Sequence, residues 1–164
     1  EKLKFLQMSI GSVPGPMDCF LLLRSLKTLG LRMQQHEKNA LEVANFLQSS
    51  SKVEKVYYPG IRTHPQYDLA RRQMCGFSGM LSFSWKGDVD KMFCMLKRLK
   101  LFILAESLGG VESLVNHPEK MTHACVPKDL RKKLGISTNL LRLSVGVESA
   151  ADLVADLEQA FSSV

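Results

Sequence analysis

The sequence predicts an α/β layered domain in which helices cover a sheet of about four strands, with a long helix beside it. Residues 80–85 and 140–145 alternate apolar and polar side chains, as strands with one buried face do. Apolar residues recur at helical spacing in residues 153–161. Strands therefore alternate with helices along the chain. The pattern leaves open an α+β arrangement with the helices on one face only.

The first part of the chain is predicted to be helical after an initial break. Two prolines around Gly15 mark that break and predict a helix that starts near Met17. Gly30 interrupts the helical pattern, so the segment is one long helix or two helices in series. We expect residues 1–48 to be a linker and a long connecting helix, followed by a C-terminal α/β domain in residues 49–164.

The remaining elements are predicted from apolar periodicity and from turn residues. The predicted strands are residues 53–58, 80–85, 101–104 and 140–145, and the predicted helices are residues 66–73, 88–99 and 149–164. Between the last two strands, residues 116–135 form a long irregular connection with a basic turn of helix near residues 129–133. Connections of that length are usually functional or unsettled.

Composition and charge are those of a single soluble, intracellular domain. The chain has 164 residues, of which 45% are hydrophobic, and no apolar run approaches the about 20 residues that cross a bilayer. The net charge is +6, but acids interleave with the bases. We interpret the basic groups 97–100 and 131–133 as solvated helix faces and expect no nucleic-acid partner.

Metal and nucleophile motifs are not found in the sequence. The 4 cysteines form no Cys-x-x-Cys pair, and the 4 histidines do not have the spacing of metal ligands. There is also no Gly-x-Ser-x-Gly elbow of the kind that serine hydrolases use. We therefore expect no metal and no serine hydrolase.

Residues 101–110 have the pattern of a functional site. The apolar residues 101–104 read as a buried strand, and Glu106, Ser107 and two glycines follow it. Such a strand would deliver a carboxylate and a hydroxyl to a cleft. The plainer interpretation is a tight turn with Glu106 in solvent.

Arg142 is the second candidate. Leu141, Leu143 and Val145 share one face of the last predicted strand, so Arg142 points to the other face. A buried guanidinium needs an anion, and it pairs bidentately with carboxylates. Arg142 is therefore a candidate carboxylate clamp. An internal ion pair with Glu148 or Glu112 is the alternative.

These residues belong to a set of motifs that closely resembles the Cys/Met-metabolism enzymes that use pyridoxal phosphate. The motifs occur over essentially the whole chain, in the order and at the spacing of that family. They are Leu26-Lys27-Thr28-Leu29, Tyr58-Pro59-Gly60, Ala105-Glu106-Ser107-Leu108-Gly109-Gly110, Met121-Thr122-His123-Ala124, Gly135-Ile136-Ser137 and Arg142-Leu143-Ser144-Val145-Gly146.

The resemblance covers only the C-terminal part of such an enzyme. It implies the C-terminal domain of a fold-type I pyridoxal-phosphate enzyme. In the family the lysine that holds the cofactor covalently lies upstream, in a Ser-x-Thr-Lys setting. Lys27 matches a later helix motif and is not that lysine. We therefore expect no cofactor-binding residue in this chain, and expect the 164 residues to be inactive alone.

The resemblance also implies roles for single residues. Arg142 matches the arginine that binds the substrate α-carboxylate, and Ser107 matches a serine that helps to position the cofactor lysine, which makes it the catalytic candidate. Thr122 matches a threonine at the carboxylate end. Glu106 occupies a position that helps to distinguish the family members acting on cystathionine from relatives that usually have a small apolar residue there. Leu108 is placed with the substrate-binding residues.

The implied function is that of a carbon–sulfur lyase acting on a small amino-acid substrate. Within the family the sequence most resembles the branch that cleaves cystathionine, and next the branch that synthesises it. A cytoplasmic homotetramer is expected by the same resemblance. A stand-alone module that works by binding or assembly, without catalysis, is the alternative of a different class.

Overall fold

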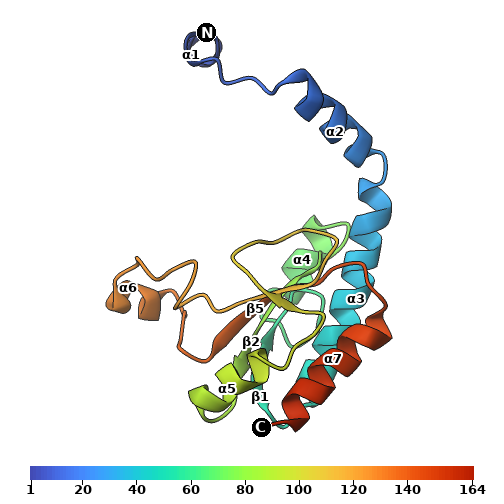
Figure 1. Ribbon diagram of the computed structural model, residues 1–164, viewed down its shortest axis with the longest axis vertical. Coiled ribbons are helices and arrows are strands. Elements are labelled where there is room, and N and C mark those ends of the chain that lie inside the picture. The colour runs from blue at the N-terminus through green and yellow to red at the C-terminus, as the bar shows by residue number, and fades with distance from the viewer. The chain divides into compact units, whose positions relative to one another are not determined.

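A computed structural model describes residues 1–164, the whole of the chain (Figure 1). Residue contacts divide it into two units, residues 1–31 and residues 32–164, and each is described by itself. No helix of the chain has both the length and the apolar character needed to cross a membrane.

The first unit consists of helices with no buried residue. These helices are α1 (Lys2–Ile10) and α2 (Pro16–Leu26). Proline at the first turn of α2 suits a helix start, and the Asp18 carboxylate accepts a hydrogen bond from the Gly15 amide at 3.2 Å. The sequence did not predict α1. The apolar side chains of both helices are exposed, as Leu3 at 83% and Leu23 at 65% illustrate.

Helix α3 (Leu29–Ser49) is the long helix that the sequence predicts. The helical segment is two helices in series, as one of the alternatives had it, but the break lies at Lys27 and Thr28, before Gly30. Glycine inside a helix costs only about 1 kcal/mol relative to alanine, so Gly30 is tolerated in the first turn of α3. From His36 onward α3 buries one face.

A five-stranded sheet forms the centre of the second unit. Its order is β1-β2-β5-β4-β3, and every pair is antiparallel except β3 with β4. The strands are β1 (Val53–Tyr57), β2 (Met80–Trp85), β3 (Ile103–Leu104), β4 (Leu114–Asn116) and β5 (Leu140–Ser144).

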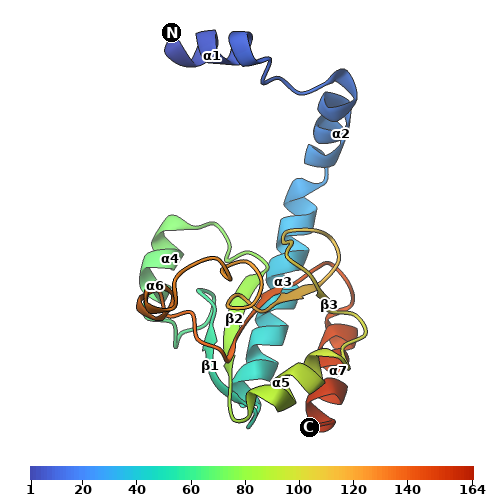
Figure 2. The same ribbon diagram turned by 60° about the vertical axis from the view of Figure 1, so that its left-hand side comes forward.

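The core lies between one face of this sheet and three helices. Alternate residues of β2 and β5, among them Phe83 and Leu143, are at most 2% exposed. They pack in one cluster with α3, α5 (Val89–Leu96) and α7 (Ala150–Ser162), which Figure 2 shows around the sheet. The predicted α/β class is confirmed. The core helices share one face of the sheet, as in the alternative arrangement.

Most of the predicted elements have their counterparts in the structure. The strands predicted at residues 53–58, 80–85 and 140–145 are β1, β2 and β5. Helix α4 (Tyr67–Gln73), α5, α6 (Lys128–Lys133) and α7 also lie where the sequence predicts helices.

The prediction of a buried strand at residues 101–104 is wrong in its length and in its burial. Only Ile103 and Leu104 form β3, and they are 55% and 51% exposed because β3 is the edge strand. The buried Asp156 carboxylate instead holds the entry to this strand: it accepts amide hydrogen bonds from residues 100, 101 and 102 at 2.9, 2.8 and 3.1 Å. Strand β4 was not predicted.

Tyr58 directly follows β1 and is fully buried. Its hydroxyl donates a hydrogen bond to the Ser78 carbonyl at 2.9 Å, and Ser78 has a left-handed backbone with φ 63°. Gly60 must lack a side chain, because a Cβ there would lie 2.6 Å from the Tyr58 ring. Burial, and to a smaller extent the Glu37 carboxylate, raises the pKa of the Tyr58 phenol far above its usual range.

We predict that the free energy of unfolding falls as pH rises above about 10, because the unfolded chain ionises Tyr58 there while the folded chain keeps it protonated. Tyr58→Phe should remove this part of the pH dependence and cost about 1 kcal/mol at neutral pH for the lost hydrogen bond. Denaturant unfolding followed by Trp85 fluorescence measures both effects.

Tyr57→Phe is the matched control, because Tyr57 is the exposed neighbour of Tyr58. It should leave the alkaline slope as it is in the unaltered chain. Identical alkaline slopes for Tyr58→Phe and the unaltered chain would contradict the assignment.

Candidate functional site

Arg142 lies in the middle of β5, on the sheet face that points away from the core helices. Its cross-strand neighbours are Ser82 of β2 and Asn116 of β4, and both are uncharged. The Arg142 side chain is half-buried, and it takes no part in the ion pair that joins Arg131 to Glu119. The chain therefore provides no charged partner for the guanidinium group of Arg142, which is a group that pairs well with carboxylates.

The alternative prediction for Arg142, an internal ion pair with Glu148 or Glu112, is wrong. Glu148 uses both carboxylate oxygens on Ser113, whose amide nitrogen and hydroxyl oxygen lie 2.6 and 2.9 Å away. Glu112 is exposed and takes part in no ion pair. Because neither acid neutralises Arg142, an anionic ligand is the partner that would offset the cost of its partial burial.

The loop of residues 105–112, called the site loop below, carries three of the predicted site residues. Glu106, Ser107 and Leu108 are all exposed, and Leu108 is 55% exposed. A carboxylate, a hydroxyl and an apolar side chain are thus presented in sequence on the surface of this chain. Glu106 lies in solvent, as in the plainer interpretation, but residues 105–108 form no tight turn.

Backbone hydrogen bonds fix the site loop on either side of those exposed residues. The Ala105 amide donates to the Val115 carbonyl at 3.0 Å, and the Gly109 amide donates to the Ser144 hydroxyl oxygen at 2.8 Å. Gly109 has φ 77°, a left-handed conformation that glycine adopts without strain. Since Ser144 stands two residues after Arg142 in the sequence, on the same sheet face, the loop is tied to the strand that carries the arginine.

Asn116 links Thr122 to these two segments. It is 1% exposed and pairs across the sheet with Arg142. Its side-chain oxygen accepts from the Thr122 hydroxyl at 3.3 Å, and its amide nitrogen donates to the Ala105 carbonyl at 3.4 Å. Because the Thr122 proton is used in this way, His123 Nδ1 donates to the Thr122 oxygen at 2.8 Å. The segments of Arg142, Thr122 and the site loop therefore meet at Asn116.

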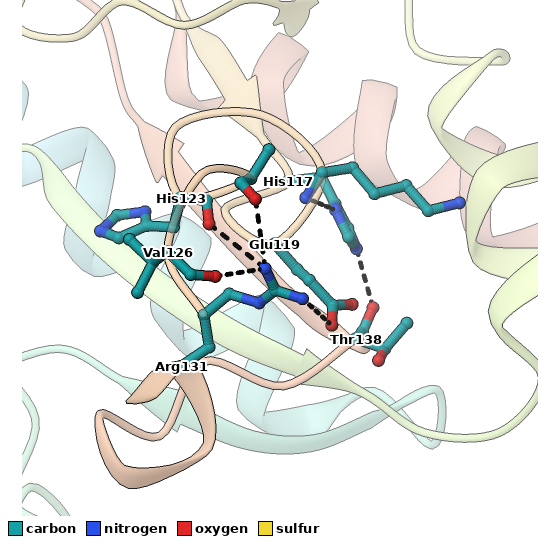
Figure 3. Close-up of polar contacts among 8 residues, drawn as sticks. His117, Glu119, His123, Val126, Arg131 and Thr138 are labelled. Atoms are coloured by element: carbon teal, nitrogen blue, oxygen red, sulfur yellow. Dashed lines mark hydrogen bonds and ion pairs between the residues drawn. The ribbon is translucent and has the colours of Figure 1, made fainter. Parts of the chain in front are cut away.

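The long connection after β4, residues 117–138, is ordered by its own polar side chains. His117 is 1% exposed, and its Nδ1 accepts from the Lys120 amide at 3.1 Å. The proton is thus assigned to Nε2, which donates to the Thr138 carbonyl at 2.8 Å. The His117 ring also lies 5.1 Å from the Phe93 ring of α5. One buried imidazole joins the start and the end of the connection (Figure 3).

Arg131 orders the middle of the same connection (Figure 3). One terminal nitrogen donates to the carbonyls of His123, Ala124 and Val126 at 3.5, 3.4 and 2.7 Å. The other lies 3.4 Å from the Glu119 carboxylate. Its side chain is only 16% exposed, so the interpretation of Arg131 as part of a solvated basic face is wrong. Backbone carbonyls without helix or strand partners are bound by a guanidinium instead.

Three residues of this arrangement were missed from the sequence: Asn116, Arg131 and the bidentate role of Glu148. Asn116 ends a strand of only three residues, which is too short for alternation to show. Arg131 stands in a run of bases, and a charge run normally indicates a solvated face. The polar residue at the end of the apolar pair 114–115 was the one available signal for Asn116.

The arrangement can bind an anion and orient groups around it. Arg142 has a guanidinium group that can donate two bonds, and Ser107 has an exposed hydroxyl, whereas the Thr122 proton is already donated to Asn116. No group of three His, Cys, Asp or Glu side chains could hold a metal ion. The Arg142 guanidinium itself has the donor geometry that fits a carboxylate.

Comparison with known proteins adds a family and named relatives. Residues 1–162 match the family model described as Cys/Met metabolism PLP-dependent enzyme. Cystathionine gamma-lyase of Dictyostelium discoideum is 58% identical over 159 residues, which cover 97% of this chain and 41% of the relative. Human cystathionine gamma-lyase is 54% identical over 163 residues, covering 99% and 40%.

Enzymes with other names are also similar. Cystathionine beta-lyase of Coxiella burnetii is 51% identical over 98% of this chain and 41% of its own length. The crystal structure of cystathionine gamma synthase from Xanthomonas oryzae, in complex with aminoacrylate and cysteine, superposes with a TM-score of 0.90 at 46% identity. That match covers 94% of this chain and 40% of the synthase. The chain thus spans about two fifths of its relatives and aligns to their C-terminal part.

We predict that Arg131→Gln loosens the connection around Thr122, because the carbonyls at 123, 124 and 126 lose their common donor. Hydrogen exchange in peptides covering residues 117–127 should accelerate, and the chain should lose about 1–3 kcal/mol of stability. Arg131→Lys should rescue little, since an ammonium lacks the planar fork. Lys132→Gln, an exposed neighbour on α6, is the control. Equal exchange in the Arg131 and Lys132 variants would refute this role.

Proposed function

The chain belongs to the Cys/Met-metabolism family of pyridoxal-phosphate-dependent enzymes, and from that premise we propose that it is the C-terminal part of a cystathionine γ-lyase. Such an enzyme cleaves the Cγ–S bond of cystathionine. With one water molecule the products are cysteine, 2-oxobutanoate and ammonia, a step of transsulfuration and cysteine biosynthesis. Release of hydrogen sulfide from related thiol substrates is a further expected reaction.

The observation that carries this proposal is Arg142, a half-buried arginine without an ion-pair partner. It supports a binding site for the α-carboxylate of an amino acid. The named relatives support the choice of reaction, because the γ-lyases of slime mould and human are 58% and 54% identical to the chain. A γ-synthase or β-lyase is the alternative, which the synthase structure and the bacterial relative favour.

In this proposal each predicted residue has one task. Arg142 binds the α-carboxylate and so fixes the plane of the substrate, with Thr122 at the same end. Ser107 helps to position the lysine that holds the cofactor. Glu106 and Leu108 contact the distal part of the substrate, where Glu106 selects cystathionine by its charge.

Pyridoxal phosphate, when bound, supplies an electron sink for the carbon skeleton of the amino acid. The donor set of this chain fits the carboxylate side of such a site. We propose that the cofactor lysine and the phosphate contacts belong to the part of the relatives that this chain does not span. On this proposal the 164 residues are inactive alone, with residues 1–48 connecting to that part and residues 49–164 forming the C-terminal domain.

We also propose that the complete enzyme is a cytoplasmic homotetramer. The exposed apolar side chains of α1 and α2 support association with further protein, since neither helix buries a residue within the chain. Exposed apolar surface of that kind usually marks a protein interface. The remaining partner is the small amino-acid substrate.

A chimaera tests the proposed reaction. The C-terminal two fifths of the Dictyostelium γ-lyase are replaced by this chain, since the two align over 97% of it. We expect cystathionine-dependent formation of 2-oxobutanoate. Pyruvate would instead indicate a β-lyase, and cystathionine formed from cysteine and an activated homoserine would indicate a γ-synthase.

In that chimaera Arg142→Ala should raise KM about 100-fold or more, because a bidentate charged pair is lost. Arg142→Lys should recover only part of the affinity, since one ammonium cannot make both bonds. Arg72→Ala, at an exposed arginine of α4, is the control and should leave KM unchanged. An Arg142→Ala enzyme with an unaltered KM would rule out Arg142 as the residue that binds the substrate carboxylate.

The association is tested on the 164-residue chain by sedimentation over a range of concentrations. We expect concentration-dependent association, because the apolar side chains of α1 and α2 are exposed. Replacing Leu22 and Leu23 by serine should weaken it, whereas serine at the exposed Leu69 of α4 should not. A monomer at every concentration would contradict this role of the two helices.

A further inference from the structure

We propose that Glu148 is a positioning residue of the site: its carboxylate clamps the end of the site loop to the chain segment that follows β5. It does not touch the substrate and acts through Ser113. The clamp itself is a property of this chain, while its effect on turnover rests on the function proposed above.

The geometry of the clamp is a closed set of short hydrogen bonds. Ser113 is fully buried, and its amide donates to Glu148 Oε1 at 2.6 Å. The Ser113 hydroxyl donates to Glu148 Oε2 at 2.9 Å and accepts from the Gly146 amide at 2.8 Å. Every polar atom of the Ser113 side chain and its amide is thus satisfied by one short segment. Charge-assisted bonds of this kind are the stronger class.

The acceptor is itself held in place from the other side. The Asn39 side-chain nitrogen donates to the carbonyls of Gly146 and Glu148 at 3.0 and 2.7 Å. Asn39 lies on α3 and is fully buried. Since α3 belongs to the core, the Glu148 backbone is a fixed point, and its carboxylate transmits that position to Ser113.

Gly146 allows the two segments to approach. A Cβ at this position would collide with the Val111 carbonyl, with the backbone of Glu112 and with the Glu148 carboxylate. Beside it, the Val147 amide donates to the Val111 carbonyl at 2.8 Å. Residues 111–112 and 146–147 therefore approach each other next to the contact between the Glu148 carboxylate and Ser113.

Nothing within the chain holds the three exposed residues 106–108 directly, so the anchors at the loop ends decide where they lie. Before these residues the Ala105 amide is bound to the Val115 carbonyl, and after them the anchors are the Gly109 amide on Ser144 and Ser113 on Glu148. Arg142 lies on the strand that leads into the same segment. Glu148 thereby helps to fix the site loop, and with it Glu106 and Ser107, relative to Arg142.

Three variants separate the clamp from general stability. Glu148→Ala removes both acceptors and leaves the buried Ser113 amide and hydroxyl unpaired. Glu148→Gln keeps one acceptor for the Ser113 amide, but its amide NH2 group cannot accept the hydrogen bond that the Ser113 hydroxyl donates. It should therefore be intermediate. Glu158→Ala is the matched control, because Glu158 is exposed on α7.

Hydrogen exchange of the 164-residue chain is the first measurement. We expect peptides covering residues 105–113 to exchange about tenfold faster in Glu148→Ala and less so in Glu148→Gln. Peptides of β1 and β2, and the emission of the buried Trp85, should stay as in the unaltered chain. Unchanged exchange in residues 105–113, or an equal rise throughout the chain, overturns the proposal. If Glu148→Ala unfolds, Glu148→Gln decides by the same criterion.

Turnover in the chimaera is the second measurement. Glu148→Gln should lower kcat about tenfold and change KM less than about threefold, because Arg142 still binds the carboxylate while Ser107 is displaced. A rise in KM alone, as expected for Arg142→Ala, would overturn the positioning role of Glu148. If the unaltered chimaera is inactive, the proposed function fails, and the exchange experiment alone still decides the clamp.

Discussion

The segment that follows β5 is the constraint on which the rest of this chain depends. Its backbone is bound from the core side by His36, whose Nδ1 lies 2.7 Å from the Val145 carbonyl, and by Asn39 on α3. From the other side it receives the site loop through Ser113 and Glu148. Core and site thus use the same few residues, and the absence of a side chain at Gly146 is what lets them meet.

This division of polar partners explains why Arg142 remains available. Glu148, the nearest acid along the chain, spends its carboxylate on neutral donors of Ser113. The neighbours across the sheet, Ser82 and Asn116, bring no charge. A partly buried cation is costly without a counter-charge, so the fold maintains a standing affinity for an anion at this position. In the function proposed above, the carboxylate of the substrate would offset a cost that the folded chain has already incurred.

Elements that follow from local pattern were predictable, and elements that depend on distant partners were not. The amphipathic pattern of α7 and the alternation in β2 and β5 are contained in their own residues. Strand β4 exists only because β3 and β5 flank it, and Arg131 is buried only because the carbonyls at 123–126 turn toward it. Sequence also placed Arg142, Thr122 and the site loop as candidates, but not Asn116, through which they meet.

Three charged residues whose contacts the sequence did not predict share one physical role, which is to replace regular secondary structure as the partner of backbone groups. Asp156 does this for three amides before β3, Arg131 for three carbonyls after β4, and Glu148 for one amide at the end of the site loop. An irregular segment in a folded domain must satisfy these groups or lose its conformation. Substrate-contacting residues on irregular segments therefore inherit their precision from charged side chains that never contact the substrate. A charged residue held by backbone groups, far from it in sequence, is accordingly the first place to look for control of such a site.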